Sequence, residues 1–235
     1  LIISTHFGLA HQIATIKSEI EFQKGIEIEL IVQVTDDSPQ HIWFVPGADL
    51  IFVPSKRTKI ELNKYRQQQG LRPVPMVVSP YPANPKLVKQ LSQEQLKQKS
   101  EQLFPDSNKS INFVIPISGA AVGLKYFTKL VNQLGLWSDR YQFSVVSRYS
   151  AHTKDFLKKM AGRTGTQVYT AKEDREVVDF YEKLYQEEVV SLEITKPSEQ
   201  AFKALLEPTR VGGSILLFSQ PVGRQEYDNL DFLTK

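Results

Sequence analysis

Residues 111–148, INFVIPISGAAVGLKYFTKLVNQLGLWSDRYQFSVVSR, contain the pattern that decides the fold. An apolar, β-type run ends near Ser118, and a glycine-containing loop follows it. A helical stretch then extends from Leu124 to Trp137, and a second apolar run begins at Tyr141. Short strands that alternate with helices of this length predict βαβ units and therefore a parallel sheet.

The same alternation continues in both directions from this stretch. Downstream, strands are expected at 166–170, 189–195 and 214–219, which brings the count in this part of the chain to about five. Upstream, strands are expected at 1–4, 26–35 and 50–53, with helical patterns at 8–23 and after Ser55, which is expected to be the N-cap of the second helix. We therefore predict an α/β protein with two Rossmann-like lobes, each a parallel sheet flanked by helices.

The predicted lobes are separated by a polar connector. We assign residues 1–85 to the first lobe, 86–108 to the connector and 109–235 to the second lobe. The apolar run at Leu1 reads as a buried strand with nothing before it, and the helical pattern near 227–235 stops abruptly. These ends lead us to expect that the first lobe is incomplete.

Composition narrows the classes of function. The 235 residues are 41% apolar, and the formal net charge of +3 comes from basic and acidic residues spread along the chain, so no nucleic-acid partner is predicted. The sequence has no cysteine, which excludes a disulfide, a thiolate zinc site and a thiol nucleophile and agrees with a cytoplasmic location. No apolar run approaches the length of a membrane span.

The loop from Ser118 to Gly123 joins a strand to a helix at the edge where open α/β sheets bind ligands. Gly119 and Gly123 permit tight turns and close approach of the backbone to a ligand. An ordinary βα turn explains the loop equally well, because the full glycine pattern of dinucleotide-binding proteins is absent.

A second loop, ITKPSEQAF at 194–202, has features of an anion site. Lys196 ends a strand, and Ser198 is expected to cap a helix whose free N–H groups favour phosphate. Glu199 either stabilises that helix start or accepts hydrogen bonds from sugar hydroxyls, and we favour the second role.

A third polar stretch, SQPVGRQEYDN at 219–229, follows the last predicted strand. We expect it to lie beside Ser198 and Glu199 on the same edge of the sheet, where Gln225, Glu226 and Asn229 would meet sugar hydroxyls. A phosphate on the helix start and a hydroxyl-rich ring against this loop together suggest a nucleotide sugar.

The first lobe has its own polar loop, TDDSPQHIWF at 35–44. Asp36 or His41 could act as a general base there, although composition favours an ordinary solvated loop by roughly two to one. Two adjacent carboxylates, Asp36 and Asp37, make only a weak case for a metal.

Three segments of the first lobe, ISTHFGLAHQIA (3–14), VQVTDDSPQHIWFVPGADLIFVPSKRTKIEL (32–62) and VVSPYPANP (77–85), resemble galactosyl- and glucosyldiacylglycerol synthases. GRQEYDN at 223–229 is similar to a motif of the related N-acetylglucosaminyltransferase that makes lipid II. These are GT-B glycosyltransferases, with two Rossmann-like lobes and usually no bound metal or other cofactor.

The resemblance implies a nucleotide-diphosphate sugar donor, with UDP the expected nucleotide, and a lipid or small-molecule acceptor. It places Gly119, Ala120, Ala121 and Val122 near the diphosphate or the acceptor, and Arg148 near the base or phosphate. It assigns Ser198 and Glu199 to phosphate and ribose, and Gln225 and Glu226 to the donor sugar.

The sequence departs from the family in lacking its glycine-rich turn after Lys196 and in having Glu226 where the family has a second glutamine. The family's glycine-rich catalytic loop would precede residue 1.

Hexosyl transfer is thus the leading hypothesis, with two alternatives. One is a nucleotide-sugar-binding module without catalysis, and the other is a nucleotide-sugar epimerase with the same fold. The segment FVPSKRTK at 52–59 leaves peripheral contact with an anionic membrane open, although we favour an ordinary amphipathic helix start there.

Overall fold

The computed structural model describes residues 1–79 and 81–234, without the side chains of residues 199 and 200. The chain divides into two compact units. Unit 1 comprises residues 1–82 together with 222–235, and unit 2 comprises residues 83–221. Each unit contains a parallel sheet with helices packed on it, which confirms the predicted α/β class.

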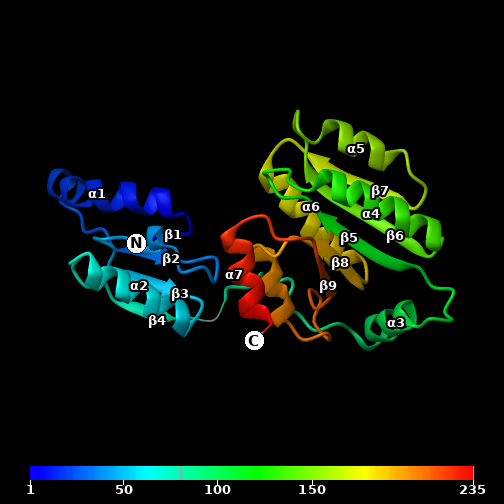
Figure 1. Cartoon of the computed structure of the whole chain (residues 1–235), viewed down its shortest axis with the longest axis horizontal. Coiled ribbons are helices and arrows are strands. Elements are labelled where there is room, and N and C mark those ends of the chain that lie inside the picture. The colour runs from blue at the N-terminus through cyan, green and yellow to red at the C-terminus, as the bar shows by residue number, and fades with distance from the viewer. Residues whose placement is uncertain (80, 235) are drawn as a thin grey trace. The chain divides into compact units, whose positions relative to one another are not determined.

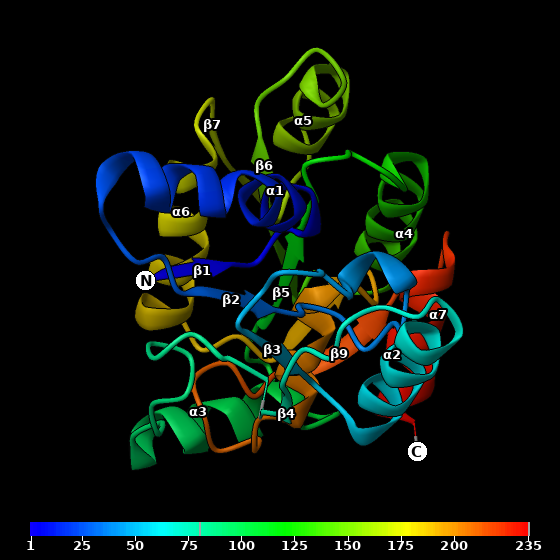
Figure 2. The same ribbon diagram turned by 90° about the vertical axis from the view of Figure 1, so that its left-hand side faces the viewer.

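Unit 1 is built on a sheet of four parallel strands in the order β1-β2-β3-β4 (Figures 1 and 2). The strands are β1 (Ile2–Ser4), β2 (Leu30–Gln33), β3 (Leu50–Val53) and β4 (Met76–Val78). The helices are α1 (Phe7–Lys24), the 3-10 helix η1 (His41–Trp43), α2 (Lys56–Gln68) and α7 (Arg224–Leu233). Because the strands follow one another in sequence order, right-handed crossovers bring α1 and α2 to the same face of the sheet.

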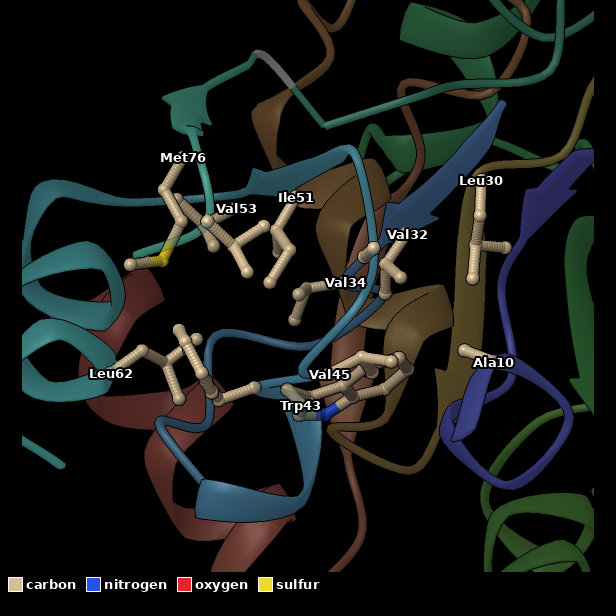
Figure 3. Packing of buried hydrophobic residues seen from close by; sticks show 13 residues of the cluster. Ala10, Leu30, Val32, Val34, Trp43, Val45, Ile51, Val53, Leu62 and Met76 are labelled. Carbon is tan, nitrogen blue, oxygen red and sulfur yellow. The ribbon is translucent and has the colours of Figure 1, made fainter. Parts of the chain in front are cut away.

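The core of unit 1 lies between that face and the helices. Figure 3 shows Val32, Ile51 and Val53 of the sheet pointing toward the side from which Ala10 of α1 and Leu62 of α2 approach. Trp43 and Val45 fill the space between the two helices and are buried. On the opposite face, Ile3 and Val77 remain exposed.

Two side chains set the starts of the main helices of unit 1. His6 caps α1, since its Nδ1 accepts hydrogen bonds from the N–H groups of Gly8 and Leu9 at 3.1 and 3.4 Å. Ser55 caps α2 by accepting a hydrogen bond from the N–H of Thr58, as the sequence predicts.

Unit 2 is built on a sheet of five parallel strands in the order β7-β6-β5-β8-β9. The strands are β5 (Ile111–Pro116), β6 (Tyr141–Arg148), β7 (Thr166–Ala171), β8 (Leu192–Thr195) and β9 (Ile215–Phe218). The helices are α3 (Gln93–Leu103), α4 (Leu124–Trp137), α5 (Lys154–Ala161), α6 (Asp174–Glu187) and the 3-10 helix η2 (Glu199–Leu205). The strand order reverses at β5, so the crossovers cover both faces of the sheet.

Each face of this sheet has its own core. Phe127 of α4 and Phe156 of α5 pack on the face that Phe113 and Val145 point to. Tyr185 of α6 packs with Val114 on the other face. The two clusters agree with the alternation of side chains along each strand, and α4 and α5 lie together on one side of the sheet in Figure 1.

The structure differs from the expected division at the C-terminal end. From the sequence all of residues 109–235 are expected in the second lobe, but α7 belongs to unit 1. Residues 86–108, expected to be a connector, belong to unit 2, and their helical part forms α3. None of the helices in the described ranges combines the length and the apolar character needed to cross a bilayer.

Candidate functional site

The point at which the strand order of unit 2 reverses lies between β5 and β8. These strands are parallel neighbours, with Phe113 opposite Leu192 and Val114 opposite Glu193. The loops that leave their carboxyl ends, residues 117–123 and 196–198, therefore start side by side. In open α/β sheets this is the place where ligands bind. We call these two loops the switch-point loops.

The first switch-point loop has an unusual backbone. Ala121 has φ 51° and donates its N–H to the carbonyl of Ser118 at 2.9 Å, closing a turn. Gly123 has φ 84° and is the N-cap of α4, where no side chain satisfies the first N–H groups. Gly119 and Ala120 are exposed, and no side-chain or backbone atom lies within 4 Å of the position that a Cβ of Gly119 would take. Because a glycine at the N-cap has no side chain to accept them, the first N–H groups of α4 and the open space at Gly119 are a candidate site for an anion.

The second switch-point loop differs in part from its prediction. Lys196 directly follows β8 and is half-buried, as expected of a residue at a strand end. Ser198, in contrast, makes no capping hydrogen bond with its side chain, and the following helix is the seven-residue 3-10 helix η2. The expected capping bond of Ser198 and the dipole of a full α-helix are therefore not found here, which leaves Lys196 as the stronger candidate for anion binding in this loop. The side chain of Glu199 lies outside the described part of the structure.

Arg148 ends β6 and is exposed, but its guanidinium already has partners. Its Nε donates to the carbonyl of Lys172 at 3.0 Å, and its Nη1 lies 3.2 Å from Oδ2 of Asp174. Both partners lie on the segment that leads from β7 into α6. A nucleotide contact by Arg148 would have to replace this exposed ion pair, which costs little.

A buried charge cluster, which is not predicted from the sequence, supports the second switch-point loop. Glu193 of β8 is fully buried, and its Oε2 accepts hydrogen bonds from Tyr185 at 2.5 Å, from Tyr181 at 2.8 Å and from Lys203 of η2. Burial raises the pKa of both tyrosines and lowers that of Lys203. The only available signal was a single glutamate within the apolar run 189–195.

The second polar site lies in unit 1, around Asp36 and Asp37. Both carboxylates are buried, at 2% and 1% exposure, so the prediction that composition favours here, a solvated loop, is wrong. Asp37 accepts hydrogen bonds from the hydroxyls of Ser55 and Thr58, the latter at 2.8 Å. These bonds attach the loop after β2 to the start of α2.

The residues expected to hold a sugar in the second lobe instead lie against Asp36. Nδ2 of Asn229 donates to Oδ1 of Asp36 at 2.9 Å, and Gln225 donates to Oδ2. Oδ1 of Asn229 accepts the N–H of Asp37 at 2.9 Å. Burial raises the pKa of Asp36, although the hydrogen bonds from the two amides oppose this effect.

Gln225, Glu226 and Asn229 thus belong to unit 1, whereas Lys196 and Ser198 belong to unit 2. The expectation that all five share one edge of one sheet is wrong, because the chain leaves unit 2 at Val222. Glu226 accepts the N–H of Val222 at 2.8 Å and so fixes the start of α7. Further bonds hold α7 to unit 1, namely Asp228 to Ser38 at 2.7 Å and Arg57 to Asp228 and Asp231 at 3.2 and 3.1 Å.

His41, the other candidate base, lies in η1 and is exposed. Its ring stacks on Tyr65 of α2 with 4.1 Å between ring centroids. Within residues 1–79 and 81–234, no three His, Cys, Asp or Glu side chains gather in a way that could hold a metal ion.

Comparisons with known proteins support the fold. No family model and no curated protein matches the sequence. Among solved structures, the S. aureus MnaA–UDP complex is similar, with TM-score 0.51 and 12% identity over 94% of this chain and 62% of that one. OtsA in its apo form has TM-score 0.46 and 10% identity, over 92% of this chain and 62% of its own. An E. coli trehalose-6-phosphate protein bound with UDP-2-fluoro glucose has TM-score 0.45 and 11% identity, over 99% and 64%. This chain therefore spans less than two thirds of the length of these proteins, and its likeness to the MnaA structure concerns the fold alone.

Proposed function

We propose that this chain acts in a GT-B glycosyltransferase that moves a hexose from a nucleotide-diphosphate sugar to an acceptor. The switch point between β5 and β8 is the observation that carries the proposal. There the open backbone of residues 117–123 and the half-buried Lys196 offer N–H groups and a cation to a diphosphate. The similar MnaA structure contains UDP, which supports UDP as the nucleotide.

Within this proposal, Arg148, Ser198 and Glu199 lie on the loops or strand ends that surround the nucleotide. Gln225 and Glu226 at the start of α7 stay candidates for the donor sugar on the strength of the family resemblance alone. Asn229 is fully buried, with both ends of its amide bonded to the Asp36 loop, so we assign it the role of holding α7 in place.

His41 is the better of the two candidate bases. A general base must be able to reach the proton that it removes. Asp36 is buried with both carboxylate oxygens bonded to amides, whereas the imidazole of His41 is exposed and fixed in orientation by Tyr65. We therefore propose that Asp36 organises the loop and that His41 is available to an acceptor hydroxyl. A lipid acceptor, a cytoplasmic location and peripheral contact with a membrane remain predictions.

Nucleotide binding tests the proposal directly. We expect UDP, measured by calorimetry and thermal unfolding against ADP and GDP, to bind and to stabilise the protein by about 2.7 kcal/mol at a hundred times its Kd. Lys196→Met should weaken UDP binding by roughly tenfold or more, because a charge-assisted hydrogen bond to phosphate contributes about 1.5–3 kcal/mol. Lys183→Met, an exposed lysine on α6 of the same unit, is the matched control and should leave the Kd unchanged.

Turnover of the UDP-sugar that binds most tightly separates the alternatives. The transferase is supported if the wild type transfers the sugar to an acceptor and His41→Ala does not, while the Kd for UDP is unchanged. Binding with no turnover identifies a nucleotide-sugar-binding module, and an epimerised sugar with no acceptor identifies an epimerase. Absence of binding by every nucleotide at millimolar concentration contradicts all three.

A further inference from the structure

A groove on unit 2, separate from the switch-point loops, has no role in the proposed transfer. Its volume is about 610 Å³, within the range of small-molecule sites. Leu96 and Leu103 of α3 form one wall, Leu206 lies at the end of η2, and Ile215, Leu216 and Phe218 of β9 form the other wall. We call it the Lys99 groove, because Lys99 of α3 is the one charged side chain among the described residues that line it.

Lys99 is buried in an unusual way. Lys99 is only 7% exposed, and its Nζ donates hydrogen bonds to the carbonyls of Pro208 and Gly213 at 2.9 and 2.8 Å. An ammonium group has three N–H donors, so two carbonyls leave one for a further acceptor. Two neutral carbonyls also leave its charge uncompensated.

The other buried lysine of unit 2 shows the contrast. Lys203 is paired with the carboxylate of Glu193, which offsets part of the effect of burial on its pKa. Burial lowers the pKa of Lys99 as well, and no carboxylate in the described part of the chain opposes this. Lys99 therefore has the surroundings of a cation whose counter-charge comes from a ligand.

We propose that the Lys99 groove binds a free single-chain fatty carboxylate. The carboxylate would accept the remaining N–H of Lys99, and the hydrocarbon chain would lie between the leucines of α3 and the side chains of β9. The exposed Ile215, at 48%, also lines the groove and adds apolar surface that a hydrocarbon chain would cover. Charge and apolar lining together select an anionic amphiphile over a neutral or cationic one.

Dodecanoate, used below its critical micelle concentration with the intact chain, is a suitable probe. Calorimetry should show one site, with dodecanol binding more weakly and dodecyltrimethylammonium not measurably. Lys99→Met should weaken dodecanoate binding by roughly tenfold or more, the loss expected for a charge-assisted hydrogen bond. Lys97→Met removes an exposed lysine of the same helix and should change the Kd by less than about twofold, because a solvated charge at this distance contributes little.

Lys99 also holds the segment 208–213, so its substitution could unfold the protein, which circular dichroism would reveal. Ser100→Trp provides a second variant. Ser100 lines the groove from the exposed side of α3, and an indole there should fill the groove and abolish dodecanoate binding while UDP binding persists. Equal affinity for dodecanoate and dodecyltrimethylammonium, or binding that survives Ser100→Trp, overturns the proposal. A second result would also overturn it. If an apolar peptide protects the amide of Leu216 from hydrogen exchange and dodecanoate does not displace that peptide, the groove is a strand-docking site.

Discussion

Asp36 is a carboxylate that folding removes from water, so its ionisation opposes folding. Its pKa is raised above 3.8, chiefly by burial. The stability that Asp36 contributes is fully present below 3.8 and is lost as the pH rises through the raised pKa of the folded protein. Asp49 behaves in the opposite sense, because a hydrogen bond from Lys17 at 2.5 Å lowers its pKa below 3.8. The stability that Asp49 contributes is present above 3.8 and is lost as the pH falls.

We predict that Asp36→Asn and Asp49→Asn change the pH dependence of unfolding in opposite directions. In urea unfolding between about pH 3 and about pH 6, the wild type should lose the stability contributed by Asp36 as the pH rises, and Asp36→Asn should not show this loss. Asp49→Asn should remove a smaller gain, because the side chain of Asp49 is 43% exposed and solvent screens its ion pair. Parallel pH profiles for wild type and Asp36→Asn would show that Asp36 is not buried as described.

At the scale of elements, α7 is held to unit 1 mainly by polar side chains. Asn229, which is fully buried, joins the helix to both Asp36 and Asp37. The half-exposed Arg57 and the buried Ser38 add bonds to Asp228. The attachment of this helix therefore depends on hydrogen-bond geometry more than on apolar area.

We predict that Asn229→Ala loosens α7. The substitution leaves Oδ1 of Asp36 and the N–H of Asp37 without this partner, at about 1–3 kcal/mol for each buried group. Hydrogen exchange should accelerate at the amides of 224–233 and of the Asp36 loop. Tyr227→Ala is the control on the same helix, since Tyr227 is 56% exposed, and its exchange rates should match those of the wild type. Faster exchange in both variants would mean that the helix frays for other reasons.

The elements could be predicted to the extent that their signals are local. The strand Leu50–Val53 and the cap Ser55 are correct to the residue, because apolar runs and capping side chains act over a few positions. Ser198 was expected to cap a helix for the same reason, yet it does not, because η2 is fixed instead by Lys203 bonding to Glu193 and two tyrosines of α6. Such contacts join residues that are distant in sequence and leave little periodic signal.

At the scale of the whole molecule, the two units differ in how the chain builds them. Unit 2 is one continuous segment, residues 83–221, with a core on each face of its sheet. Unit 1 needs two segments, 1–82 and 222–235. The sequence predicts two lobes but not this return of the chain, because polar residues at 225–229 suit an exposed loop as well as a buried bond to Asp36.

We predict that a fragment of residues 83–221 unfolds cooperatively, whereas a fragment of residues 1–82 does not. Without α7, the latter leaves the buried Asp36 without the amides of Gln225 and Asn229. Adding a synthetic peptide of residues 222–235 in trans should restore a cooperative transition to the 1–82 fragment, measured by circular dichroism. A peptide with Asn229→Ala serves as the control and should restore less. Cooperative unfolding of 1–82 alone would contradict this account.

The discontinuity of unit 1 sets the timing of its biosynthesis. Residues 1–82 leave the ribosome before unit 2 but meet helix α7 only after the whole of unit 2 has been translated. At roughly 5–20 residues per second, this delay is on the order of ten seconds. During that interval the nascent chain carries all four strands of the unit 1 sheet, but the Asp36 carboxylate lacks its bonds to Gln225 and Asn229, so unit 1 matures after the unit that is translated later.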